Sequence, residues 1–272
     1  MFSPLVSWRP ARALRAPLTA CAASLLIGCG AAVSERTALN ISAGPVNQLD
    51  IAGFACGPAA LLTSFRCGSE EWQKVAADIP GESDRSKMLY IIRAHGLRPS
   101  ESLRGRQRWT RSGINPEDLS VIARELTGNS MLRPVSEALG RKRGESLEAC
   151  LSRVHGLLRN SIKNGCPPIL TLSRKVSRDG HWQSVQGHYV TVVEIPERLP
   201  RGATSLTLKC FDPWGGRQVT GTLMIPTEPV LPDASGKPTC LTAEIPGTPL
   251  NGTKAHGGRP SAVIPTMFIG VR

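Results

Sequence analysis

The sequence has no apolar run long enough to cross a bilayer. The apolar stretch near the N-terminus, residues 16–28, has 13 residues, and no later segment approaches the length of about 20 that a spanning helix needs. We therefore expect no membrane-spanning helix.

Several short motifs of common enzyme classes are also missing. The chain contains no C-x-x-C pair, no phosphate-binding G-x-x-x-x-G-K-[ST] loop and no G-x-S-x-G turn. These absences argue against a zinc site built on paired cysteines, a P-loop nucleotide site and a serine-hydrolase elbow. The sequence gives no reason to expect a metal or another cofactor.

Acidic residues are absent from residues 1–28, where three arginines precede the apolar stretch. This basic-then-apolar order is typical of a secretory signal. The stretch ends in Leu-Ile-Gly-Cys, which resembles the bacterial lipobox, and that resemblance implies lipidation of Cys29 and export to the periplasmic or cell-surface side of a membrane. Residues 29–47 are small and polar, and we expect them to form a flexible tether.

Length and charge limit the number of domains and the kinds of partner that the remaining chain can have. Removal of 28 residues with three arginines leaves 244 residues with a formal charge of +9, enough for one main domain, which we place at residues 48–272. Such a charge is compatible with nucleic acid, anionic lipid or an acidic cell-wall polymer, and it does not choose among them. The basic run 141–143 is more typical of a solvated helix flank than of a binding site, and we expect no nucleic-acid partner.

The two halves of this domain differ in pattern. The first half favours helices and the second favours short β-branched strands, whereas residues 226–260 are rich in Pro, Gly and Thr and predict a long loop. Asn115 is the expected N-cap of one helix, with Pro116 at its first position. We therefore predict an α+β fold with helices at 56–65, 70–77, 86–94, 116–126 and 146–163, and a mainly antiparallel sheet of strands at 169–172, 189–195, 205–211, 218–225 and 262–271.

Cys56 is the candidate nucleophile. It begins the helix predicted at 56–65, where the helix dipole and the free N–H groups favour a thiolate. Gly57 allows close approach of backbone, and the Cys56 N–H is free to help form an oxyanion hole.

A thiolate mechanism also needs an imidazole and an acceptor that orients it. His188 opens the apolar run 189–193, and Asp212 ends the strand predicted at 205–211. His181 is a competitor, but it lies in the polar 178–180 loop. For Asp212 the alternative is a turn aspartate that bonds its own backbone. The other histidines are expected to be solvated or structural: His95, His155 and His256.

Together these residues resemble the papain-fold family that includes bacteriocin leader peptidases. The matching motifs are Cys56-Gly57-Pro58-Ala59, Gly187-His188-Tyr189-Val190 and Phe211-Asp212-Pro213-Trp214, in the family's order. The resemblance covers about residues 48–225. It implies a papain-like fold and a catalytic triad of Cys56, His188 and Asp212.

The oxyanion-hole glutamine departs from the family pattern. The family places it about six residues before the nucleophile, whereas here Gln48 lies eight before Cys56 and Asp50 takes the sixth place. An ionised carboxylate cannot donate a hydrogen bond. Gln48 is therefore the candidate donor, provided that a two-residue bulge brings it in.

These features predict a cysteine peptidase or amide hydrolase that acts on a peptide or other amide through a thioester. A γ-glutamyl transferase or a transpeptidase on the same fold would use the same residues, and a cell-wall endopeptidase ranks lower because Asp-Cys-Ser-Gly is absent. A papain-like domain that has lost activity, and a non-catalytic lipoprotein that binds peptide or cell-wall polymer, remain as alternatives.

Cysteine pairing stays open. Export permits disulfides, and the six cysteines after Cys29 could form three bridges, or fewer if Cys56 is a free nucleophile. Cys56 and Cys67 should not pair, because a helix would hold them about 16 Å apart, beyond the roughly 7 Å limit. Pairing among the others is left undecided: Cys67, Cys150, Cys166, Cys210 and Cys240.

Overall fold

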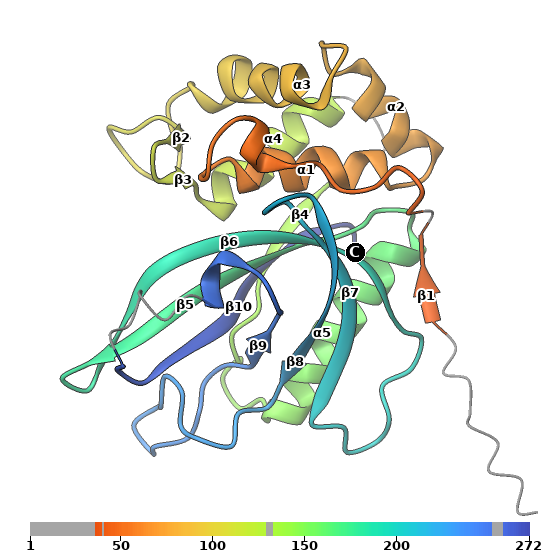
Figure 1. The fold of residues 1–272 in the computed structure, drawn as a ribbon. Coiled ribbons are helices and arrows are strands. Elements are labelled where there is room, and N and C mark those ends of the chain that lie inside the picture. Colours follow the sequence, from red (N-terminus) through yellow and green to blue (C-terminus); the bar gives the residue numbers. More distant parts are fainter. Residues whose placement is uncertain (1–35, 40, 129–132, 252–257) are drawn as a thin grey trace, which may run out of the picture. The chain divides into compact units, whose positions relative to one another are not determined.

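The structure is a computed structural model, and it describes residues 36–39, 41–128, 133–251 and 258–272. The expected signal peptide, residues 1–28, and the expected lipidation site Cys29 lie outside these ranges. The described chain is an α+β fold in which helices precede most of a sheet (Figure 1). No helix in these ranges is long and apolar enough to span a membrane.

The helices follow the predicted pattern closely. Asn115 caps α4 by accepting from the Asp118 N–H, and Pro116 is the first helical residue, as expected. The helix predicted at 86–94 is wrong in one respect, since α3 gives way to the wider π-helical turn η2. The helical elements are α1 (Cys56–Arg66), α2 (Glu70–Asp78), α3 (Asp84–Tyr90), α4 (Pro116–Thr127), α5 (Leu147–Lys163), η1 (Gln48–Asp50), η2 (Ile91–Gly96) and η3 (Pro249–Asn251).

The main sheet is antiparallel in every pairing. Its strand order is β4-β10-β5-β6-β7-β8-β9, and β1 also pairs with β6. The five predicted strands are present as β5, β6, β7, β8 and β10. The bounds are β1 (Arg36–Ala38), β4 (Val135–Ala138), β5 (Ile169–Arg178), β6 (His181–Pro196), β7 (Ser205–Asp212), β8 (Arg217–Met224), β9 (Thr242–Glu244) and β10 (Ser261–Gly270), with a separate ribbon of β2 (Trp109–Thr110) and β3 (Gly113–Ile114).

The β5–β6 hairpin is longer than the sequence indicated. Asp179 and Gly180 form its tip, and both have positive φ, 52° and 79°, as a type I′ turn requires. His181 therefore belongs to β6 and not to a loop, and His188 lies in the middle of that strand. The apolar pattern missed residues 181–187 because they are mostly exposed.

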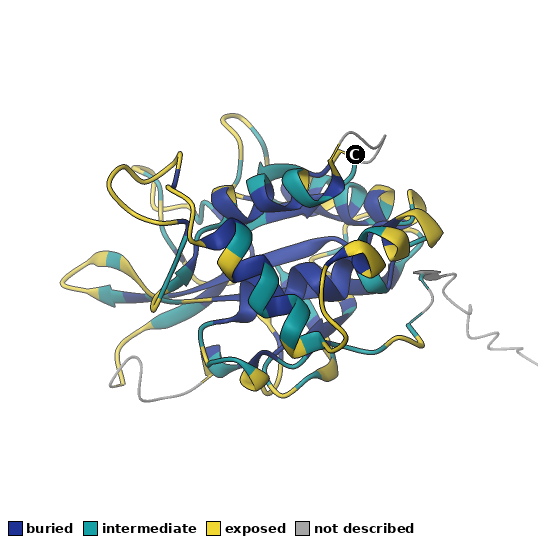
Figure 2. Cartoon of the chain, turned by 90° about the horizontal axis from the view of Figure 1, so that it is seen from above, coloured by how far each residue is buried: buried dark blue, intermediate teal, exposed yellow. Residues whose placement is uncertain are grey.

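The sheet separates two hydrophobic cores. Side chains of β6 alternate, so that Val190 and Val192 join the cluster under α5, while Tyr189 joins the cluster under α1 and α4. Figure 2 shows the result, with buried residues on the inner faces of the helices and strands and exposed residues on the loops. Helix α1 is buried from Cys56 to Phe65.

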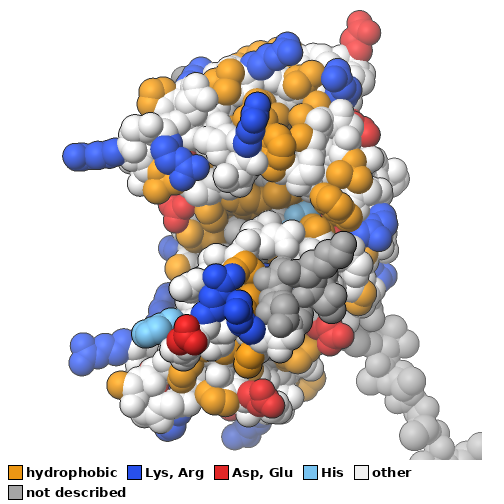
Figure 3. Space-filling model, turned by 60° about the vertical axis from the view of Figure 1, so that its left-hand side comes forward, with side chains coloured by type: hydrophobic (Ala, Val, Ile, Leu, Met, Phe, Trp, Pro, Cys, Tyr) orange, Lys and Arg blue, Asp and Glu red, His pale blue; other side chains and the backbone are white. Residues whose placement is uncertain are grey.

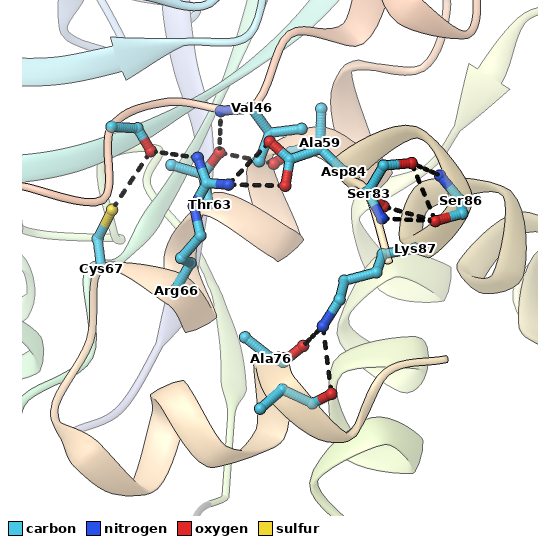
Figure 4. Close-up of polar contacts among 12 residues, drawn as sticks. Val46, Ala59, Thr63, Arg66, Cys67, Ala76, Ser83, Asp84, Ser86 and Lys87 are labelled. Carbon is cyan, nitrogen blue, oxygen red and sulfur yellow. Dashed lines mark hydrogen bonds and ion pairs between the residues drawn. The ribbon is translucent and has the colours of Figure 1, made fainter. Parts of the chain in front are cut away.

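Polar contacts fix the C-terminal half of α1 (Figure 4). The Val46 N–H donates to Thr63 Oγ1 at 3.0 Å, and Arg66 forms an ion pair with Asp84 at 2.7 Å, which joins α1 to α3. The Cys67 thiol donates to the Gly44 carbonyl at 3.7 Å. These bonds hold α1, and hence its first residue, in a defined position.

Two expected boundaries need revision. The segment expected to be a tether contains β1, and Val46 within it is fully buried, so the folded part begins before Gln48. The segment expected to be a loop at 226–260 contains β9 and η3. Strands as short as β1 and β9 show too little periodicity for a sequence pattern to reveal them.

Candidate active site

Cys56 is the first residue of α1, and its side chain is almost buried. The N-cap residue, Ala55, makes no side-chain cap, and the Ala55 and Ala59 N–H groups bond to the carbonyls of Ala52 and Ala55. Pro58 has no N–H. Within the described chain, the Cys56 and Gly57 N–H groups of this turn are left for a bound oxyanion.

The structure shows why position 57 requires glycine, which could not be seen in the sequence. A Cβ at this position would lie 2.4 Å from Ile114 Cγ2, on β3. The close approach is thus made by a side chain and not by backbone. Glycine allows the β2–β3 ribbon to pack against the start of α1.

His188 and Asp212 are bonded to each other across neighbouring strands. His188 Nε2 lies 2.6 Å from Asp212 Oδ1, and both side chains are buried. Because Nε2 is engaged, Nδ1 is the ring nitrogen left for Cys56. Cys56 and His188 line the same groove and interact through their side chains, so the structure brings the three residues together from α1, β6 and the end of β7.

The His188 ring is held in its charged form. Burial lowers its pKa, but hydrogen bonds with Asp212 and Cys56, together with the charges of both groups, outweigh this and raise the pKa to about 9. The imidazolium is therefore the form to expect at neutral pH. A cationic ring beside a thiol favours the thiolate.

The Asp212 carboxylate accepts one hydrogen bond within its own turn and one from His188. Its Oδ1 accepts the Trp214 N–H at 2.8 Å, which is the local turn bond considered as an alternative, and the same oxygen accepts from His188. Arg217 Nη2 lies 3.7 Å from Oδ2. The turn fixes the carboxylate, and the carboxylate orients the imidazole.

Gln48 is buried between the two parts of the site. Its N–H donates to the Pro213 carbonyl at 2.9 Å, and its Nε2 donates to the Gly53 carbonyl at 2.7 Å, three residues before Cys56. Gln48 is the first residue of the short turn η1. Asp50 is exposed and bonded to Asn47. Gln48 is fully buried and is not among the residues that line the groove beside Cys56, so its role as oxyanion donor stays a prediction.

A groove of about 780 Å³ runs past Cys56 and His188. Apolar side chains line it near the thiol, and polar side chains line it along β5 and β6. Figure 3 shows the hollow on this face, with hydrophobic side chains within it and Lys and Arg side chains above and below. The apolar lining includes Phe54, Ile114, Tyr189 and Trp214.

The other described cysteines are buried and unpaired, and Cys56 and Cys67 do not bridge, as predicted. None of them lines the groove. Burial raises the pKa of each, to about 11 for Cys67 and Cys240 and about 12 for Cys166, and upward for Cys150 and Cys210. They are neutral thiols that pack as small apolar groups.

The remaining histidines have structural surroundings. His95 Nδ1 lies 2.7 Å from Glu125 Oε2, and His155 Nε2 lies 2.8 Å from the Pro196 carbonyl oxygen. His181 is exposed near the hairpin tip, seven residues along β6 from His188 and thus about 23 Å away. His256 lies outside the described residues. The structural reading of His95 and His155 is confirmed.

Sequence reasoning missed two residues of the site. Tyr189 is buried, and its hydroxyl donates to the Ile114 carbonyl at 2.8 Å, which ties β6 beside His188 to β3. Trp214 lies against Gly53, with ring carbons 3.6 and 3.9 Å from where a Cβ added to Gly53 would stand. The available sequence signal for both was their position in the motifs, since Tyr189 follows His188 and Trp214 lies two residues after Asp212.

Comparisons with known proteins gave no match. No family model matches the sequence, and no curated protein matches it significantly. Among the described residues, no group of three or more His, Cys, Asp or Glu side chains could hold a metal ion.

Proposed function

We propose that this protein is a papain-like cysteine peptidase or amide hydrolase with Cys56, His188 and Asp212 as its catalytic triad. The observation that supports it most is the buried hydrogen bond of 2.6 Å between His188 and Asp212. His188 lines the same groove as Cys56, which is the first residue of α1. The helices-then-sheet order of the α+β fold is compatible with the papain-like assignment.

In the proposed reaction, the Cys56 thiolate attacks an amide carbonyl. The resulting oxyanion accepts hydrogen bonds from N–H groups of the α1 N-terminus and of Gln48. The C–N bond breaks as the His188 imidazolium gives its proton to the leaving amine. Neutralisation of the thiolate removes part of the charge that raises the His188 pKa, which makes this proton transfer easier.

The thioester is then hydrolysed. His188, now neutral, takes a proton from water, and the hydroxide attacks the thioester carbonyl. The C–S bond breaks, and a carboxylic acid, the thiolate and the imidazolium are formed. If an amine replaces water, the same residues carry out transpeptidation or γ-glutamyl transfer.

The proposed setting is the periplasmic or cell-surface side of a bacterial membrane. The lipobox-like sequence at Cys29 supports a lipid anchor, and the order of the three motifs supports membership of the family that includes bacteriocin leader peptidases. The proposed partners are a peptide or other amide substrate and the membrane itself.

The test is the pH dependence of Cys56 alkylation by iodoacetamide. In the wild type the reaction should persist toward pH 5, and His188→Ala should move its midpoint up toward about 8.5, the value of an ordinary thiol. Cys56→Ala is the control for labelling at other cysteines. Identical midpoints near that value in both proteins would contradict catalysis and favour the non-catalytic binding protein.

A further inference from the structure

The groove beside Cys56 carries charge of one sign on its described lining. Arg111 lines it from the turn between β2 and β3, and Lys175 lines it from β5. One cationic side chain thus comes from the helical part of the fold and one from the sheet. No Asp or Glu side chain is among the described lining residues. Glu117 follows Pro116, which lines the groove, but is not itself part of that lining.

Arg111 is exposed and Lys175 is half-buried, and their partners differ from those of three arginines that are buried or half-buried. Arg66, Arg108 and Arg153 each form an ion pair with a carboxylate of this chain. No described carboxylate forms an ion pair with Arg111 or Lys175. They are left to interact with whatever occupies the groove.

The catalytic groups do not add to this positive charge. The His188 imidazolium is bonded to the buried Asp212 carboxylate, and the charges of Asp212 and Cys56 offset its own. An anionic group that enters the groove is therefore attracted by Arg111 and Lys175.

Hydrogen-bond donors accompany the cations along the sheet. Thr171 is more than nine-tenths buried, lines the groove, and has an Oγ1 without a partner among the described residues. Ser173 and Ser184 share one hydrogen bond of 2.6 Å, and Gln186 follows on β6. Hydroxyl and amide donors beside a cation are suited to a carboxylate.

We infer that the amide substrate carries a carboxylate on the part that lies in this groove, and that Arg111 and Lys175 bind this carboxylate. This rests on the proposed function and narrows its substrate class to acidic peptides or other anionic amides. The apolar lining near Cys56, including Phe54 and Trp214, then contacts the uncharged part of the acyl group.

The inference can be tested without knowing the substrate. Iodoacetate and iodoacetamide are similar in size and alkylate thiolates by the same displacement of iodide, but only iodoacetate is anionic. The measured quantity is the ratio of their rates at Cys56, read by mass spectrometry of its peptide. Because the triad residues are unchanged in all variants, their own charges affect every ratio alike.

We expect the ratio in the wild type to exceed that of a free thiol and to fall as salt is added, since surface charge is screened. Arg111→Gln and Lys175→Gln should each lower it about twofold, and the double variant about fourfold. Arg143→Gln, on an exposed turn before α5, is the matched control and should leave it unchanged.

The outcomes separate the two proposals. A ratio that does not respond to either substitution, with Cys56 still reactive at acidic pH, overturns the substrate class and leaves the enzyme proposal intact. Slow reaction with both reagents and an ordinary thiol pH dependence overturns the enzyme proposal itself. A lower ratio in Arg143→Gln would attribute the effect to net charge and overturn the inference.

Discussion

His188 Nε2 and Asp212 Oδ1 are 2.6 Å apart inside the protein, and the same oxygen accepts the backbone N–H of Trp214. The bond from Trp214 lies within the turn that follows β7, and the bond from His188 joins that turn to the imidazole on β6. Because the turn bond already fixes the carboxylate, orienting His188 requires no further ordering of Asp212.

The first prediction concerns the charge of Asp212. Asp212→Asn keeps an oxygen that can accept from Nε2 but removes the negative charge, so burial of the ring weighs more and the His188 pKa should fall from about 9. NMR titration of histidine labelled at Cε1 measures this directly. Alkylation of Cys56 at neutral pH should slow, but less than in Asp212→Ala, in which the imidazole also loses its orientation.

Arg217→Gln is the control for this prediction. Its Nη2 lies 3.7 Å from Asp212 Oδ2, and the side chain is exposed, so solvent screens its charge. The His188 titration should hardly move in that variant. An unchanged His188 pKa in Asp212→Asn would show that Asp212 is not the group that keeps the ring charged.

The second prediction concerns the packing at Gly57. Gly57→Ala forces a methyl group to 2.4 Å from Ile114 Cγ2, and such overpacking should cost about 1–3 kcal/mol of unfolding free energy. Ile114→Ala alone should cost about 2–5 kcal/mol. The double variant should be more stable than the sum predicts, because each change relieves the other. Thermal or urea unfolding measures all three.

Gly156→Ala is the matched control, since Gly156 lies within α5 and a Cβ there meets nothing within 4 Å. That variant should be neutral or gain up to about 1 kcal/mol of helix stability. Additive losses at 57 and 114 would mean that the two residues do not interact.

The sequence predicted the chemistry-bearing residues better than their surroundings. Cys56 could be placed at a helix start because Pro58 and the following helix formers mark one, and β7 could be ended at Asp212 because Pro213 follows. Both signals are local. The Tyr189 bond to Ile114 and the approach of Ile114 to Gly57 join residues 75 and 57 positions apart, and no local pattern encodes such contacts.

The exposed half of β6 shows a second limit. Its first seven residues include Gln183, Ser184 and Gln186, and their pairing with β5 comes from the Asp179-Gly180 turn and not from apolar alternation. The turn dipeptide was visible in the sequence, but without the apolar pattern it indicated a loop. His188 consequently seemed to begin a strand whose middle it occupies.

The third prediction concerns the leader. Labelled palmitate should enter the protein when it is expressed in a bacterium, and Cys29→Ala should abolish the label and release the protein from the membrane fraction. Cys21→Ala, eight residues earlier in the same leader, is the matched control and should keep both. Label that persists without Cys29 would remove the lipobox argument.

The fourth prediction separates Gln48 from the nucleophile itself. Alkylation by iodoacetamide develops no oxyanion, whereas acylation by p-nitrophenyl acetate does, so loss of an oxyanion donor should slow only the second reaction. Gln48→Ala should lower the acylation rate about 10²-fold and leave the alkylation rate nearly unchanged. Asp50→Asn should change neither, because Asp50 is exposed and bonded to Asn47. Equal losses in both reactions would instead mean that Gln48, through its bonds to Gly53 and Pro213, only supports the position of Cys56.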